Sequence, residues 1–114
     1  MAERKVTVAI TQMACSWNMA ETLDRAEALV REAAARGAGL VLLQELFATP
    51  YFCAAMTPAH FDLAEPFEGN SLVARFADLA RELSVVLPIS YFERTERRFF
   101  NSVAIVDADG GVLG

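Results

Sequence analysis

The sequence has little positive charge and only one histidine. Ten Lys and Arg residues stand against fifteen Asp and Glu residues, which gives a formal net charge of -5. Binding to nucleic acid depends on clustered Lys and Arg, so no nucleic-acid partner is expected. His60 has no neighbouring ligand residues at metal-binding spacing, so the sequence predicts no metal site around it.

Long apolar runs are also missing. No stretch approaches the roughly 18 apolar residues that a membrane-spanning helix needs. The start, MAERK, lacks the apolar core and cleavage site of a signal peptide. The two cysteines, Cys15 and Cys53, are therefore expected to be free thiols in a reducing compartment. Together these absences predict a cytoplasmic protein without a membrane partner.

The first half of the chain shows a strand-helix-strand pattern. Residues 5–13 alternate and are rich in β-branched side chains, which predicts a strand. Asn18 and Glu21 have the spacing of a helix-capping pair, and Gly37 is a natural helix end. The short apolar run Leu40–Leu43 then predicts a second strand, buried on both faces. Such a unit predicts parallel strands joined by a right-handed crossover.

The second half predicts a helix and a hairpin after a long connection. Residues 49–67 contain three prolines and are expected to hold a short helical turn at 58–64. Asn70 or Ser71 can begin a helix. Two strands, 85–92 and 99–106, should pair antiparallel across a charged loop. Gly110 or Gly111 should have a positive φ in the following turn, and a further strand should begin at Val112. The helix that begins at Asn70 or Ser71 should bury Leu72, Phe76, Leu79, Ala80 and Leu83.

The fold class that follows is α/β, and the chain is expected to be one part of a larger domain. With 114 residues it is long enough for one domain at most. The last expected strand has no visible partner within the sequence. Residues 1–114 are therefore predicted to be a segment cut from a longer domain.

Glu45 is the main candidate for chemistry. It follows the second predicted strand, at the sheet edge where open α/β sheets place ligand chemistry. Burial there would make its carboxylate a stronger general base. The alternative is a charged residue that simply ends the strand in water. Tyr51 and Phe52 follow on the loop, and they either line a pocket for an aliphatic amine or pack in a core or interface.

Several separated motifs resemble those of the nitrilase superfamily of carbon–nitrogen hydrolases. They are residues 8–13 (VAITQM), 37–47 (GAGLVLLQELF), 50–52 (PYF) and 100–110 (FNSVAIVDADG). The resemblance covers the whole chain, in order. It implies the N-terminal portion, residues 1–114, of a single domain with an α-β-β-α sandwich fold. In this portion it implies a mixed sheet with helices on one face.

The resemblance implies a Glu, Lys and Cys triad that works without a metal or organic cofactor. Glu45 matches the glutamate, which takes the proton from the cysteine thiol so that the thiolate attacks the substrate. The only lysine here, Lys5, lies far from the family's lysine position. Cys15 and Cys53 do not match the family's nucleophile. Residues 1–114 alone are therefore expected to be inactive.

The substrate is implied only through the branch that the motifs resemble. Residues 14–18 (ACSWN), 44–53 (QELFATPYFC) and 63–67 (LAEPF) are most similar to the branch that hydrolyses N-carbamoylputrescine to putrescine, carbon dioxide and ammonia, a step of polyamine biosynthesis. The alternatives are another ureide or amide hydrolase, such as a β-ureidopropionase or an ω-amidase, or a non-catalytic binding or assembly module. The family commonly forms homo-oligomers, and one is expected here.

Overall fold

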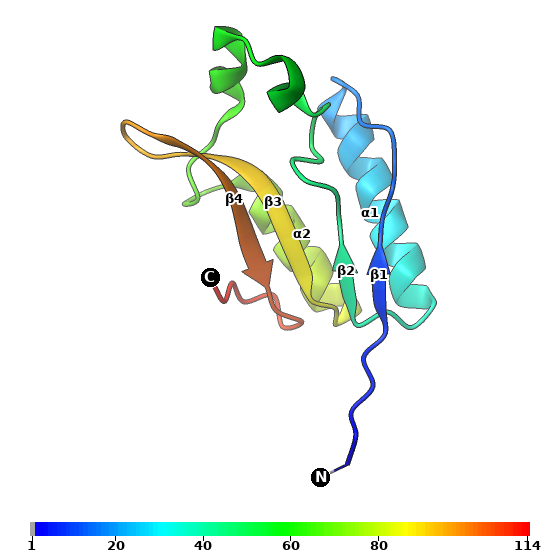
Figure 1. Cartoon of the computed structure of the whole chain (residues 1–114). Helices are drawn as coiled ribbons and strands as arrows, with labels where there is room; N and C mark the ends of the chain where they lie inside the picture. Colours follow the sequence, from blue (N-terminus) through cyan, green and yellow to red (C-terminus); the bar gives the residue numbers. More distant parts are fainter. Residues whose placement is uncertain (1) are drawn as a thin grey trace.

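The protein is a mixed α/β structure with two α-helices and four strands among residues 2–114, the part that the computed structural model describes (Figure 1). Two short 3₁₀ helices, η1 and η2, occupy the long connection in the middle of the chain. In chain order the elements are β1 (Val8–Ile10), α1 (Met19–Ala35), β2 (Leu40–Leu42), η1 (Phe52–Ala55), η2 (Pro58–Leu63), α2 (Ser71–Leu83), β3 (Leu87–Arg94) and β4 (Phe99–Val106).

The strands form two pairs that are linked into one mixed sheet. β1 and β2 are parallel, whereas β3 and β4 are antiparallel along their whole length. A parallel bridge between Leu40 and Val86 joins the pairs, because the Val86 N–H donates to the Gly39 carbonyl (2.9 Å) and the Val41 N–H donates to the Val86 carbonyl (3.1 Å). The predicted parallel unit, the antiparallel hairpin and the mixed sheet are confirmed.

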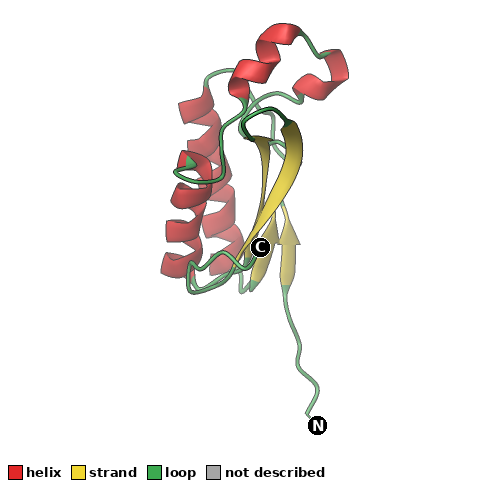
Figure 2. Ribbon diagram, turned by 90° about the vertical axis from the view of Figure 1, so that its left-hand side faces the viewer, coloured by secondary structure: helices red, strands yellow, loops and turns green. Residues whose placement is uncertain are grey.

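Both long helices lie on the same face of the sheet, as Figure 2 shows from the side. Arg75 on α2 pairs with Asp24 on α1 (2.8 Å), so the two helices are also joined at the surface. The core fills the space between helices and strands and holds Ala26, Val30, Val41, Phe76, Leu79, Ala80, Leu87, Ile89, Ala104 and Val106. The predicted arrangement, with helices on one face, is confirmed.

The ends of the helices follow the signals in the sequence. The Glu21 N–H donates to the side-chain oxygen of Asn18 (3.2 Å), and the Val73 N–H donates to that of Asn70 (3.0 Å). Each bond satisfies a backbone donor that the first helical turn leaves without a partner. After α1 the chain turns through Gly37 at φ +94°, a conformation that glycine adopts without steric cost.

The prediction that the second strand is buried on both faces is wrong. Val41 is fully buried, but its neighbour Leu42 is 45% exposed. The apolar run indicated a strand correctly, but it could not show that helices cover only one of the two faces. The first strand is also shorter than predicted, and the third is shifted toward Arg94.

Two further details differ from the predictions. In α2 the buried residue near the N-terminus is Val73, whereas Leu72 and Leu83 are only partly buried. Val112 forms an isolated antiparallel bridge with Val106 rather than a strand. The turn at Gly110 has the expected positive φ (+86°), and η2 lies where a helical turn was predicted. None of the helices among residues 2–114 is long and apolar enough to cross a membrane.

The sheet face opposite the helices is apolar and open. The exposed fractions are 63% for Val8, 82% for Ile10, 45% for Leu42 and 53% for Val103. Since side chains alternate along a strand, Asn101 lies on the same face as Val103, its neighbour two positions on. This open face carries the residues described next.

Candidate active site

Glu45 lies in a turn directly after β2, on the outer side of that turn. The next two residues, Leu46 and Phe47, are buried, with exposed fractions of 4% and 0%. The Phe47 ring meets the Phe76 ring of α2 edge to face, with centroids 5.2 Å apart. The turn thus directs the side chains of Leu46 and Phe47 inward, whereas the Glu45 side chain is exposed at the surface.

The backbone of this turn is strained and is held by a hydrogen bond. Leu46 has a φ of +50°, a left-handed conformation that costs a residue with a Cβ roughly 1–2 kcal/mol. Its N–H donates to the Ser90 side-chain oxygen on β3 (2.8 Å). Burial of Leu46 and this bond together keep the turn in place, and thereby fix where Glu45 leaves the backbone.

The carboxylate of Glu45 is bound by Asn101, a residue 56 positions later in the chain. The side-chain N–H of Asn101 donates to Oε1 of Glu45. Asn101 lies on β4 opposite Phe92 of β3, so the contact holds the carboxylate over the open face of the sheet. The expected burial of Glu45 is not present among residues 2–114, where both partners are exposed.

An open hollow lies beside Glu45. The chain segment after β1 forms one wall, and the turn and loop after β2 form the other. The lining residues are Met13, Cys15, Gln44, Glu45, Thr49, Pro50 and Tyr51. The structure therefore brings two of the predicted site residues, Glu45 and Tyr51, to the same hollow.

Tyr51 is close enough to Glu45 to respond to its charge. The pKa of the Tyr51 phenol is raised above its ordinary value, chiefly by the negative charge of Glu45, because ionisation would place a second anion beside the carboxylate. Partial desolvation and Cys53 raise this pKa further. At neutral pH the phenol is therefore a neutral hydrogen-bond donor next to Glu45.

Phe52, the third predicted site residue, is not in this hollow. It is 5% exposed, and its ring lies 5.0 Å from the Phe92 ring and 5.4 Å from the His60 ring, between centroids. It lines a separate, mostly apolar cavity with residues such as Leu46 and Leu63. The structure thus places Phe52, the first residue of η1, beneath the loop, and Tyr51, the residue before it, at the surface.

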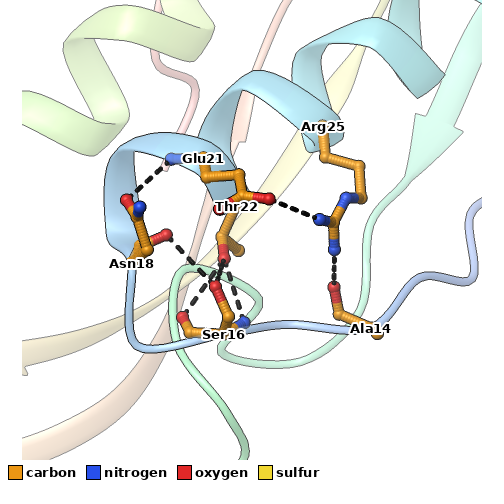
Figure 3. A network of polar contacts seen from close by, with 6 residues as sticks. All are labelled: Ala14, Ser16, Asn18, Glu21, Thr22 and Arg25. Atoms are coloured by element: carbon orange, nitrogen blue, oxygen red, sulfur yellow. Dashed lines mark hydrogen bonds and ion pairs between the residues drawn. The ribbon is translucent and has the colours of Figure 1, made fainter.

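The wall that carries Met13 and Cys15 is tied to the start of α1 (Figure 3). Ser16 and the fully buried Thr22 are joined by two backbone–side-chain hydrogen bonds, of 3.0 and 3.1 Å. The Arg25 guanidinium donates to the Ala14 carbonyl (2.6 Å). This network holds residues 14–18 against the helix and gives the hollow a rigid wall.

Gln44 joins the two walls. Its side-chain N–H donates to the Met13 carbonyl (2.7 Å), and its side-chain oxygen accepts from the Thr11 hydroxyl (3.4 Å). The residue next to Glu45 therefore connects the chain after β1 to the chain after β2, and it fixes the width of the hollow.

The hollow holds a carboxylate but no activated nucleophile from residues 2–114. Burial raises the pKa of the Cys15 thiol, and Arg25 opposes this only partly, so Cys15 is mainly a neutral thiol. Lys5 is not among the lining residues. Across residues 2–114, no group of three or more His, Cys, Asp and Glu side chains is placed to hold a metal ion. The arrangement can accept a proton and donate hydrogen bonds.

Sequence reasoning missed Ser90 and assigned Asn101 a different contact. The family resemblance of residues 100–110 implies for Asn101 a role in fixing the backbone near the site, whereas in the structure its side-chain N–H donates to the Glu45 carboxylate. A serine within a strand carries no signal of its own. Only the register, which pairs Ser90 with Val103, places it on the same face as Asn101.

The link between Tyr51 and Glu45 gives a testable expectation for the 114-residue chain. Replacing Glu45 by Gln should lower the pKa of Tyr51, because the main charge that opposes phenolate formation is removed. The two tyrosines can be followed separately by NMR of ring-labelled protein. Tyr91 is an internal control. Its pKa is raised to about 12, chiefly by burial and further by Glu93, and Glu45 is not among the causes. An unchanged Tyr51 pKa would show that the two groups are not neighbours.

Comparison with known proteins shows which family the chain resembles. Residues 7–114 match the family model described as carbon-nitrogen hydrolase. The chain is 50% identical to N-carbamoylputrescine amidase of Oryza sativa subsp. japonica over 113 residues, which are 99% of this chain and 38% of that protein. It is 37% identical to citrullinase of Francisella tularensis over 109 residues, 96% of this chain and 38% of that protein.

The fold of the chain is similar to part of a solved structure. The carbon-nitrogen hydrolase from Helicobacter pylori G27 matches with a TM-score of 0.85 and 33% sequence identity, over 96% of this chain and 38% of that chain. The chain thus spans about 38% of the length of these relatives.

Proposed function

The chain belongs to the carbon-nitrogen hydrolase family, and from that premise we propose that residues 1–114 are the N-terminal portion of one such domain. In this proposal the complete enzyme is cytoplasmic, forms homo-oligomers, and hydrolyses N-carbamoylputrescine to putrescine, carbon dioxide and ammonia. The identity to the rice protein supports the substrate. The name of the Francisella relative supports the class, because citrulline also carries a terminal carbamoyl group on an aliphatic amine.

The observation that carries the proposal is the placement of Glu45. Its carboxylate lies at the rim of a hollow, fixed by Asn101 on one side and bounded by Tyr51 on the other. A general base needs this combination of a fixed position and access to the reacting group. A charged residue that merely ended the strand would need neither the hollow nor the bond to Asn101.

The proposed reaction has two halves, both served by Glu45. It first accepts the proton of a cysteine thiol, and the thiolate attacks the carbamoyl carbon. The C–N bond then breaks, Glu45 returns the proton to the departing nitrogen, and a covalent thioester-type intermediate remains. A lysine ammonium stabilises the oxyanion that forms at the attacked carbonyl. Glu45 then takes a proton from water, whose oxygen attacks the intermediate. The C–S bond breaks, the cysteine thiol regains its proton, and the carbamic acid that is released decomposes to carbon dioxide and ammonia. The lysine and cysteine are proposed to lie outside residues 1–114.

Tyr51 and Phe52 have different parts in this proposal. Tyr51 is half exposed in the hollow and presents its ring and hydroxyl beside the carboxylate, where the aliphatic chain of the substrate would lie. Phe52 does not contact the substrate in this proposal. It packs on Phe92 beneath the loop that carries Tyr51 and supports that loop.

A substrate panel tests the proposal. The complete enzyme, made from the whole reading frame that contains residues 1–114, should hydrolyse N-carbamoylputrescine with a kcat/KM at least about tenfold above that for β-ureidopropionate or an ω-amide. Equal or better turnover of β-ureidopropionate or the ω-amide would assign it to that activity instead.

The 114-residue chain alone should be inactive. Activity of that chain, or a reading frame that ends at Gly114, would contradict the proposal that it is part of a larger domain.

A second candidate is a non-catalytic binding or assembly module, and the open apolar face favours it. Ile10 and Val8 are the most exposed apolar side chains of that face. Size-exclusion chromatography of the 114-residue chain separates the two functions. A module should be stable and monodisperse, whereas a segment of a larger domain should aggregate or associate tightly through this face.

A further inference from the structure

Glu45 is the only proposed reacting group in this segment, so the residue that holds it determines how it works. We infer that Asn101 is a positioning residue for Glu45, fixing Oε1 and leaving Oε2 as the atom that accepts the thiol proton. This inference rests on the proposed function of Glu45. It adds a residue of β4 to the machinery of the hollow, although Asn101 does not line the hollow itself.

The first support is that Asn101 is carried by a rigid element. β3 and β4 pair through all eight residues of each strand, from Leu87 opposite Val106 to Arg94 opposite Phe99. Ser90, on the neighbouring strand and the same face, holds the backbone N–H of Leu46 (2.8 Å). One hairpin therefore binds both the backbone beside Glu45 and its carboxylate. A long side chain that would otherwise sample several rotamers is held in one.

The second support is the chemistry of the donor. An amide N–H is neutral, so it orients a carboxylate without adding a positive charge beside it. A lysine or arginine at this position would form an ion pair, which favours the ionised carboxylate and weakens it as a base. A hydrogen bond from asparagine also favours the ionised carboxylate, but less than an ion pair does. It therefore directs one oxygen of Glu45 and weakens the other less as a proton acceptor.

The third support is that the bond contributes little to the fold of residues 2–114. Asn101 and Glu45 are both exposed, and neither belongs to the apolar core. A hydrogen bond between two exposed side chains adds little to stability, because water satisfies both groups when the bond is broken. A bond across 56 residues at the rim of a hollow is better explained by the orientation that it gives to the carboxylate.

The experiment compares three variants of the complete enzyme. Asn101→Leu keeps the approximate size and removes the donor. Asn101→Asp replaces the donor by a second carboxylate. Ser102→Ala is the matched control, since the Ser102 hydroxyl also donates to a carboxylate, Oε1 of Glu93 (2.7 Å), from the same strand but away from Glu45. Thermal unfolding shows whether each variant folds like the parent.

Asn101→Leu should lower kcat by roughly tenfold to a hundredfold with KM changed less than about twofold, because a misplaced base slows the chemical step more than binding. Asn101→Asp should move the acid limb of the pH–rate profile to higher pH, because two adjacent carboxylates resist joint ionisation. Ser102→Ala should change neither. An Asn101→Leu enzyme that folds normally and keeps parental kcat, or an unshifted profile for Asn101→Asp, would overturn the inference.

The result also separates this inference from the proposed function. If Glu45→Gln removes activity but the Asn101 variants do not reduce it, only the positioning role fails. If Glu45→Gln leaves activity unchanged, the proposed base itself is wrong and the positioning role falls with it. If Asn101→Leu does not fold, the profile of Asn101→Asp, which retains a polar side chain of the same size, decides the inference.

Discussion

Replacing Glu45 by Gln should lower the kcat of the complete enzyme by about 10³-fold, within the range that general acid–base groups contribute. Glutamine has nearly the same shape, but its amide cannot accept a proton from a thiol at neutral pH. Its side-chain oxygen can still accept the hydrogen bond from Asn101, so the turn should remain in place. The loss should therefore appear in kcat measured at substrate saturation, and thermal unfolding should be unchanged.

Two controls sharpen this result. Glu93→Gln neutralises another carboxylate that is bound by a side chain of β4, and it should leave kcat within about twofold of the parent. Glu45→Asp keeps the charge on a shorter side chain, so it should lose reach to Asn101 and show an intermediate rate. Full activity of Glu45→Gln would remove Glu45 from the chemistry.

Replacing Phe47 by Ala should destabilise the protein by roughly 3–5 kcal/mol, the usual cost of removing a fully buried aromatic ring. Phe47 is 0% exposed and packs edge to face on Phe76 of α2 (5.2 Å between centroids). Phe47 follows Glu45 by two residues, so the Phe47 side chain anchors the candidate site to the core. Urea unfolding of the complete enzyme would measure the loss.

The matched control for Phe47 is Phe100→Ala, because Phe100 is 43% exposed in residues 2–114. Its replacement should cost less than about 1 kcal/mol, since little buried area is lost. Comparable losses for the two variants would mean that Phe47 is not a core anchor. At temperatures where Phe47→Ala remains folded, a reduced kcat would show that the anchor also determines the position of Glu45.

Much of this fold could be predicted because its signals are local. Asn18 and Asn70 cap the helices that follow them, and Gly37 has the positive φ expected after α1. Each of these features depends on backbone groups within a few residues of the side chain concerned. The position of Glu45 after the second strand was predictable for the same reason, because the local apolar run Leu40–Leu43 indicated that strand.

The remaining features depend on contacts between distant segments, which a single sequence does not reveal. The run Leu40–Leu43 looks equally apolar whether helices cover one face or two, so the exposure of Leu42 could not be predicted. Tyr51 and Phe52 are neighbouring aromatic residues, and the sequence does not show that Tyr51 is exposed whereas Phe52, the first residue of η1, is buried. The bond between Asn101 and Glu45 requires the register of the β3–β4 hairpin.

The most direct test of the central claim is the rate at which cysteine thiols of the complete enzyme react with iodoacetamide at neutral pH, followed by mass spectrometry of the modified peptides. If the Glu45 carboxylate removes a thiol proton, one cysteine outside residues 1–114 should react fastest, and Glu45→Gln should slow it at least about tenfold. Cys15 and Cys53 should react at the same rate in both proteins. An unchanged rate at the fast cysteine, or a fastest reaction at Cys15 or Cys53, would contradict the role of Glu45.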